Sequence, residues 1–288
     1  MATVHLSSAL KSLIASPQAH GGVVPAPSRA AATALFEGLA SSAQRHGLDT
    51  PAWLVLGSAA LVTLNSPDTL CALYAFARDR CNAGERATRS VEYAGIMRET
   101  GLKTISFSGI PRAINNLGAL RAHLEPDVAS KLPTQPSREL KAADVDAMLA
   151  RGDALWNGIY DPHSKKLLAK LAQSHPDLPV HILTSHYSHL LSDPPASARP
   201  AHAAKVGRIL TSVVAIACLR AQGGVGPQVT SHVFGLRKAA DENLEGEEAI
   251  QGAEFLTSED GAQWVIEQVD RFVEAVSRSP SFATRAKL

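Results

Sequence analysis

The chain has 288 residues, of which 45% are apolar and 19% charged, and this balance excludes a wholly disordered protein. No apolar run approaches the roughly 20 residues of a membrane-spanning helix, so no membrane span is expected. The formal net charge of +1 provides no basic field for a phosphate backbone, and nucleic acid is not expected as a partner.

Alanine is the most frequent residue, whereas aromatic residues make up only 5% of the chain. Alanine is the best helix former and is depleted in strands. No stretch shows the sustained alternation of apolar and polar residues that is typical of a strand. The sequence therefore predicts an all-α fold.

Residues 1–27 differ in composition from the rest of the chain. They contain a single lysine and no arginine or carboxylate, and Pro17, Pro25 and Pro27 interrupt them. A mitochondrial presequence needs several arginines, and a secretory signal needs a longer apolar core. We expect an N-terminal arm that is able to dock on the body of the protein.

Residues 28–124 form the first predicted helical half. Ser28 and Thr50 are capping signals for two helices, and Pro51, Pro67 and Pro111 are typical of first helical turns. The helices expected here cover residues 28–45, 52–64, 67–80, 88–107 and 111–123.

A proline-containing linker is predicted at 125–141, and a second helical half at 142–279. Residues 193–197 interrupt this half, and Ser258 caps its last helix. Residues 280–288 are expected to form a flexible tail. The helices expected in the second half cover residues 142–160, 164–174, 178–191, 202–222, 227–240 and 258–276.

The two halves contain similar segments when Pro111 is placed in register with Pro227. A proline, a leucine and an arginine then coincide, and each segment follows a long helix and a glycine-containing turn. This similarity indicates an internal duplication, although two unrelated helices could share the same start signals. In a duplicated fold Asn116 occupies the position in the first half that His232 occupies in the second.

Residues 207–219, followed by Gln228, Ser231, His232 and Gly235, resemble the helix pair of the AhpD-like and carboxymuconolactone decarboxylase superfamily. The resemblance implies an AhpD-like, all-helical fold of two similar halves. It also implies a homo-oligomer, because members of the superfamily usually assemble as trimers or hexamers.

Further blocks at 98–115, 156–160 and 175–177 are similar to fungal members of this superfamily, and the resemblance covers roughly residues 30–278. AhpD itself carries a CxxC pair before its histidine and a glutamate further upstream. The residues at those positions here are Val225, Gln228 and Val213. Valine and glutamine cannot supply a nucleophilic thiolate, so the redox relay of AhpD is absent.

His232 is the candidate catalytic residue, because the decarboxylase branch of the superfamily relies on a histidine for proton transfer. A histidine with a pKa near neutrality is suited to moving a proton at a carbon acid. Gln228 lies one helical turn before His232 and Ser231 is adjacent, so both are candidates for binding the substrate. The alternative is a buried histidine whose ring is satisfied by a backbone carbonyl.

Two further residues are candidates for lining a substrate pocket. Tyr187 falls where the family often carries a tyrosine, and Glu99, with Arg98 beside it as an ion pair, lies within the fungal block. Both assignments follow from the resemblance.

His181, His186 and His189 lie close together in the sequence. His186 and His189 could meet on one face of a helix, but their spacing matches no known metal site and no carboxylate lies nearby. A solvated or interface cluster is favoured, so neither a metal site nor a cofactor is predicted.

The chain ends in Ala286, Lys287 and Leu288, a small residue, a basic residue and a leucine. This tripeptide belongs to the class that the peroxisomal import receptor recognises, of which SKL is the type member. We therefore expect a peroxisomal location, the import receptor as a partner, and a small ligand of acyl or lipid-derived type.

Two functions are compatible with these features. The first is acid–base chemistry of lyase or isomerase type, with His232 as the proton-transfer group. The second is a non-enzymatic binding or scaffold protein on an AhpD-like fold. Peroxide handling by Cys71, Cys81 or Cys218 is a distant third, because these cysteines are too far apart for a CxxC pair.

Overall fold

The computed structural model describes residues 5–16, 22–242 and 250–277. Within these ranges every regular element is helical and no strand occurs, which confirms the all-α prediction. The helices up to the predicted linker are α1 (Ser8–Ile14), α2 (Arg29–Arg45), α3 (Thr50–Thr63), α4 (Pro67–Asp79), α5 (Arg86–Lys103), α6 (Ile105–Ser108), α7 (Ile110–His123) and α8 (Pro126–Lys131). Those that follow are η2 (Ala142–Asp144), α9 (Val145–Tyr160), α10 (Ser164–Ser174), α11 (Asp177–His181), η3 (Ile182–Leu191), η4 (Ala196–Ala198), α12 (Gly207–Gln222), α13 (Gly226–Lys238), α14 (Ala253–Thr257) and α15 (Glu259–Ser277).

Several helix starts follow the local capping signals closely, but Thr50 is the first residue of α3 and not its cap, which is Asp49. The Ser28 hydroxyl accepts a hydrogen bond from the Ala31 amide at 3.3 Å where α2 begins. At the start of α15 the Ser258 hydroxyl accepts one from the Gly261 amide at 3.0 Å. Pro67 lies in the first turn of α4, where its missing N–H needs no partner.

Helix interruptions were not predicted. The helix expected at 88–107 is divided, because α5 ends at Lys103 and α6 is a separate short helix. The helix expected at 178–191 is also divided into α11 and η3, which is a π-helix. Three short helices were missed as well: α1 in the N-terminal arm, α8 inside the predicted linker and α14 before α15.

The predicted start of α12 at residue 202 was wrong by several residues. His202 and Gly207 have positive φ angles of 60° and 75°, and a left-handed backbone cannot continue a right-handed helix. The segment 192–206 therefore forms a loop, with only the short turn η4 in it, instead of extending the helix.

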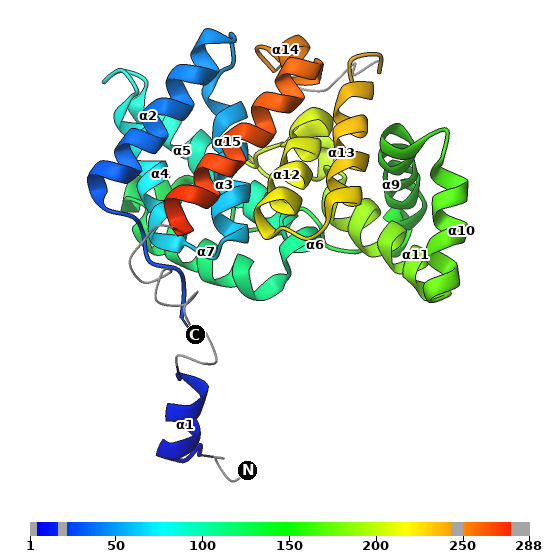
Figure 1. Ribbon diagram of the computed structural model, residues 1–288, viewed down its shortest axis with the longest axis horizontal. Helices are drawn as coiled ribbons and strands as arrows, with labels where there is room; N and C mark the ends of the chain where they lie inside the picture. The colour runs from blue at the N-terminus through cyan, green and yellow to red at the C-terminus, as the bar shows by residue number, and fades with distance from the viewer. Residues whose placement is uncertain (1–4, 17–21, 243–249, 278–288) are drawn as a thin grey trace.

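The helices α3 and α12 lie side by side at the centre of the molecule (Figure 1). Every residue of α3 from Ala52 to Thr63 and every residue of α12 from Gly207 to Leu219 is buried. Helices that are buried on all sides are core helices. One cluster of buried apolar side chains extends from Val24 to Val276, so both predicted halves contribute to a single main core.

A second, smaller core lies between α9 and η3, at the edge of the molecule where α10 and α11 also lie (Figure 1). Its buried members are Trp156, Ile159, Tyr187 and Leu191, and we refer to them as the satellite core.

The N-terminal arm contacts the body through its last residues. Val24 is buried, its N–H donates to the Asn65 carbonyl at 2.8 Å, and its carbonyl accepts from the Ser66 hydroxyl at 3.0 Å. Helix α1, by contrast, buries no side chain and lies apart from the body in Figure 1.

Of the helices in the described ranges, none has the length and apolar character required to cross a bilayer.

Candidate functional site

His232 lies inside the molecule, on the face of α13 that packs against α9. The residue is only 4% exposed. Its imidazole ring packs edge-on against the ring of Phe107, with the ring centroids 5.7 Å apart. Gly235 allows the two helices to approach, because a Cβ there would lie 2.7 Å from a methyl group of Ile159. The glycine of the sequence motif thus helps to enclose the histidine.

A chain of polar groups connects His232 to the satellite core. The His232 Nε2 and the Tyr160 hydroxyl form a hydrogen bond of 3.2 Å, and the Tyr160 and Tyr187 hydroxyls form one of 2.9 Å. Trp156 packs against both tyrosine rings, at centroid distances of 4.1 and 4.9 Å. The structure therefore brings two predicted site residues, His232 and Tyr187, together through Tyr160, which the sequence analysis did not select.

Burial determines the ionisation of this chain. Desolvation, with a smaller contribution from the positive charge of Arg208, lowers the pKa of His232 to about 4. Desolvation also raises the pKa of Tyr160 and Tyr187 above the ordinary value of tyrosine. At neutral pH all three side chains are uncharged, and His232 is a weak base. Its Nδ1 is buried and has no hydrogen-bond partner within the described chain.

The two other candidates on α13 do not reach this ring. Gln228 is exposed near the start of α13. The Ser231 hydroxyl donates to the Pro227 carbonyl of its own helix at 3.0 Å. A role for Gln228 or Ser231 in substrate binding stays a prediction.

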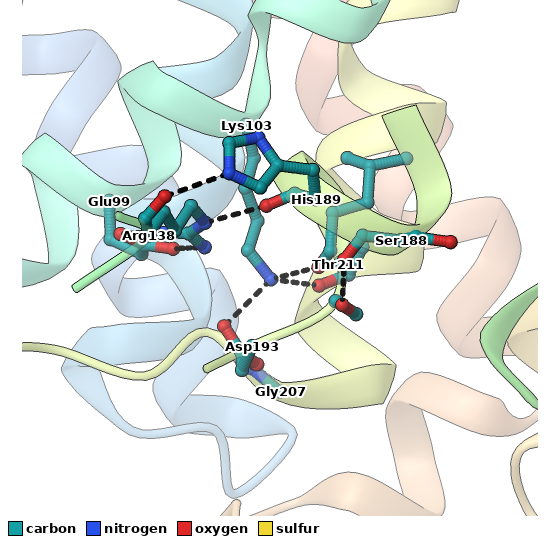
Figure 2. Close-up of polar contacts among 10 residues, drawn as sticks. Glu99, Lys103, Arg138, Ser188, His189, Asp193, Gly207 and Thr211 are labelled. Carbon is teal, nitrogen blue, oxygen red and sulfur yellow. Dashed lines mark hydrogen bonds and ion pairs between the residues drawn. The ribbon is translucent and has the colours of Figure 1, made fainter. Parts of the chain in front are cut away.

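Glu99 lies in a different polar cluster (Figure 2). Its carboxylate is bound by both terminal nitrogens of Arg138, at 2.5 and 3.2 Å. Arg138 and His189 also exchange hydrogen bonds between side chain and backbone, at 3.1 and 2.8 Å. Arg98, the expected partner of Glu99, donates instead to the Pro133 carbonyl at 3.4 Å, so the predicted ion pair was wrong. The long α5 side chains reach the linker, because the linker crosses this face of the helix.

Lys103, the last residue of α5, has a fully buried ammonium group (Figure 2). Its Nζ donates to the Leu191 carbonyl at 2.7 Å and to the Thr211 hydroxyl at 2.9 Å, and pairs with Asp193 at 2.9 Å. The other carboxylate oxygen of Asp193 accepts from the Gly207 amide at 2.8 Å, at the start of α12. The ammonium thus makes two hydrogen bonds and one ion pair inside the protein.

Asp193 is charged although most of its surface is buried. Desolvation acts to raise its pKa, but the charge of Lys103 and the hydrogen bonds from Lys103 and Gly207 outweigh it and hold the pKa below the ordinary value. The pair thus holds the loop 192–206 against the ends of α5 and α12.

A cavity of about 420 Å³ lies over this ion pair, between α9, α12 and the loop 192–206. Basic, acidic and apolar side chains line it, and we call it the arginine cleft. The lining residues that matter most for its chemistry are Arg151, Leu155, Asp193, Pro195, Arg199 and Arg208.

Arg208 is a structural cation at the wall of the arginine cleft. It is 7% exposed and binds both carboxylate oxygens of Glu242, at 2.7 and 3.0 Å. It also donates to the Ser212 hydroxyl and to the Gly235 carbonyl, at 2.7 and 2.8 Å. Arg208 therefore separates the cleft from His232 and contributes to the low pKa of that residue.

Arg151 and Arg199 differ from Arg208 in that neither has a carboxylate partner among the described residues. Arg151 donates to the Ala147 carbonyl of its own helix at 3.2 Å. The Nε atoms of both arginines are buried and lack an acceptor. The cleft thus contains two guanidinium groups whose charge the described protein does not neutralise.

Neither the arginine cleft nor the three other cavities that border α5, α9 and the loop 192–206 in the described chain is lined by His232, Tyr160 or Tyr187. His232 therefore lines none of these four cavities, the arginine cleft included.

The three clustered histidines have separate hydrogen-bond partners. His181 pairs with Ser185 at 3.2 Å, His186 with Ser106 at 3.0 Å, and His189 with the Arg138 backbone. The His181 and His186 rings pack edge-on with their centroids 5.1 Å apart, and no group of three or more potential metal ligands is found in the described ranges.

The cysteines are free thiols, and burial keeps two of them protonated. Desolvation raises the pKa of Cys71 to about 11 and that of Cys218 to about 12. A thiolate is the reactive form of cysteine, so these values oppose peroxide chemistry at both positions.

The sequence analysis missed Lys103, Asp193, Arg151 and Arg199. Asp193 was interpreted only as part of a chain break, because two prolines follow it. The useful signal was its position, because an aspartate shortly after an apolar helix end and before two prolines can bind the backbone of both segments.

No family model and no solved structure matches the chain significantly. A curated relative, Peroxisomal protein 2 of Saccharomyces cerevisiae (strain ATCC 204508 / S288c), is 29% identical over 188 residues, which cover 58% of this chain and 62% of the relative. The match thus spans less than two thirds of the relative's length. The predicted targeting residues Ala286, Lys287 and Leu288 lie outside the described residues. The similarity to this relative confirms the predicted peroxisomal location.

Proposed function

We propose that the chain is a peroxisomal, AhpD-like binding protein whose small-molecule ligand occupies the arginine cleft, and that His232 is a core residue of its fold. The observation that carries this proposal is the separation of the buried His232 from the cleft. The volume of about 420 Å³ lies in the range of small-molecule sites.

The surroundings of His232 support a structural role. A proton-transfer group must touch the reacting atoms of its substrate. The His232 ring instead packs against Phe107 and Tyr160 at a residue that is 4% exposed, and its pKa of about 4 favours the neutral form.

The internal duplication is part of this proposal and is supported by α7 and α13. Both helices carry a proline in their first turn, Pro111 in α7 and Pro227 in α13. Asn116 and His232, the residues paired by the repeat, are 0% and 4% exposed. An experimental structure in which 86–123 superposes on 202–239 would support the duplication, and native mass spectrometry would test the proposed homo-oligomer.

Native mass spectrometry of the protein purified from its own cells also tests the binding role. We expect a bound small molecule that is lost in Ala154→Trp, which fills the cleft, and retained in Ala83→Trp, whose residue does not line it. A ligand that both variants retain would contradict binding in the cleft.

Acid–base catalysis of lyase or isomerase type is the second candidate, because the Nδ1 of His232 lacks a partner in the described chain. It requires the ring to become accessible when a ligand binds. An NMR titration of the ligand-bound protein distinguishes the two, since catalysis predicts a pKa near neutrality and the structural role predicts a pKa that stays near the value of about 4.

The import signal is the last part of the proposal. A fluorescent fusion that lacks Ala286, Lys287 and Leu288 should no longer enter peroxisomes, because the receptor reads a free C-terminal tripeptide. Import that persists would contradict the assignment.

A further inference from the structure

We infer that the arginine cleft binds an amphipathic acid, with Arg151 and Arg199 holding its anionic group and the apolar wall holding a short hydrocarbon portion. This inference rests on the proposed function, in which the cleft is the ligand site. The anionic group is a carboxylate or a phosphate, because both match the two-pronged donor geometry of a guanidinium.

The negative charges of the cleft are already neutralised within the protein. Asp193 pairs with the buried Lys103, and Glu242 is bound on both oxygens by Arg208. Because both carboxylates have cationic partners, they do not create a site for a cationic ligand. The pair of Asp193 with Lys103 forms a nearly neutral floor of the cleft, and the pair of Glu242 with Arg208 forms a nearly neutral wall.

Arg151 and Arg199, which different elements contribute, add positive charge to a lining that also includes Lys205 and Arg208. Arg151 projects from α9, whereas Arg199 follows η4 in the loop 192–206, and both line the same cavity. No carboxylate of the described chain pairs with either of them. An anion between them would gain charge-assisted hydrogen bonds from both arginines.

The remaining lining is suited to a short hydrocarbon portion. Ala154 and Leu155 from α9, Leu191 from the end of η3, and Pro194 and Pro195 from the loop line the cavity. The volume of about 420 Å³ limits the length of the chain that fits. The cleft therefore combines an apolar wall with a small number of polar groups, which is typical of small-molecule sites.

Calorimetry with the full-length protein tests this ligand class with four probes: octanoate, octyl phosphate, 1-octanol and octylamine. We expect at least one of the two anions to bind, and the alcohol and the amine to bind at least about ten-fold more weakly, because they cannot use the two charges. The tighter of the two anions identifies the anionic group.

Arg151→Gln and Arg199→Gln should each weaken binding of that anion by at least about ten-fold, since each removes a charge-assisted contact. The control is Arg45→Gln on the exposed end of α2, which should leave the affinity unchanged. Circular dichroism verifies that each variant keeps its helical structure.

The outcomes separate this inference from the proposed function. If 1-octanol binds as tightly as the anions and Ala154→Trp abolishes its binding, the cleft is a binding site but the anionic class is wrong. If an anion binds with the same affinity in both arginine variants, the assignment of Arg151 and Arg199 is wrong. If no probe binds and no co-purifying ligand depends on Ala154, both proposals are wrong.

Discussion

The ammonium of Lys103 is fully buried, makes two hydrogen bonds and pairs with the carboxylate of Asp193. Replacing Lys103 with methionine would leave the carboxylate of Asp193 buried without its cation and two acceptors without a donor. Breaking a buried pair from one side usually costs about 3–5 kcal/mol, and we expect a loss of this size in the free energy of unfolding of Lys103→Met. Urea denaturation at pH 7 measures it.

The double variant Lys103→Met with Asp193→Asn is the matched control. Because it removes both charges, it should be more stable than the single variant. Equal stability of the two variants would show that the pair itself contributes little.

The imidazole of His232 makes stability depend on pH in a defined direction. The folded-state pKa of about 4 lies below the ordinary value of 6.5, so protonation favours the unfolded chain. The contribution of His232 to the free energy of unfolding is fully present above pH 6.5. It is lost progressively as the pH falls from 6.5 towards 4, where the folded protein also binds the proton. Between pH 7 and pH 5 we expect a loss of about 2 kcal/mol from this residue.

His232→Asn places at this position the residue that the repeat carries at Asn116, and it should remove that part of the pH dependence. His163→Asn, at an exposed histidine, should keep it. Urea denaturation of the three proteins at pH 7 and pH 5 provides the measurement. An unaltered pH dependence in His232→Asn would mean that the ring is not buried in its neutral form.

Among the helices, local signals were sufficient for the starts but not for the interruptions. Ser28, Ser258 and Pro67 act within one turn of their own position, so the sequence predicts their helices closely. The start of α12 depends on a distant residue, because Asp193 binds the Gly207 amide. The residues around position 202 contain no local pattern that predicts the hydrogen bond between Asp193 and Gly207.

The π-helix η3 is fixed by its packing against α9. At Gly152 an added Cβ would lie 2.0 Å from the Ser188 side chain and 2.4 Å from the Ser188 Cα, so the two elements touch through backbone. Gly152→Ala should therefore separate them and lower the free energy of unfolding by about 1–3 kcal/mol or more.

Gly118→Ala on α7 is the contrasting change for this prediction. Nothing lies within 4 Å of its added Cβ, so the better helix propensity of alanine should raise stability by about 0.5–1 kcal/mol. Thermal unfolding of both variants measures the two effects, and a neutral Gly152→Ala would contradict the close approach of α9 and η3.

In the whole molecule, the candidate site depends on contacts between segments far apart in the sequence. The helical class and the starts of several long helices follow from composition and capping, because these act locally. The arginine cleft combines α9, α12 and a loop between them, and its floor needs Lys103 from the first predicted half. Neither spacing nor periodicity encodes which of these residues meet, so the sequence led to His232 instead.

The two cores differ in size, and this difference predicts which part of the molecule unfolds locally first. The main core around α3 and α12 includes residues from Val24 to Val276, whereas the satellite core has four buried members. Amide hydrogen exchange should therefore be faster in α9 and η3 than in α3 and α12, because local opening of the smaller core exposes less apolar surface. Mass spectrometry of exchange at pH 7 measures both.

A pair of matched substitutions makes this order of opening testable. Trp156→Leu should accelerate exchange in α9 and η3 and leave α12 unchanged, because Trp156 belongs to the satellite core alone. Phe272→Leu, in the main core, should accelerate exchange in α3, α12 and α15 together, because it lowers the stability of the whole fold. Since the arginine cleft lies between α9 and α12, the same opening would admit a ligand without unfolding the main core. Equal acceleration of α12 by both substitutions would show instead that the two cores unfold as one.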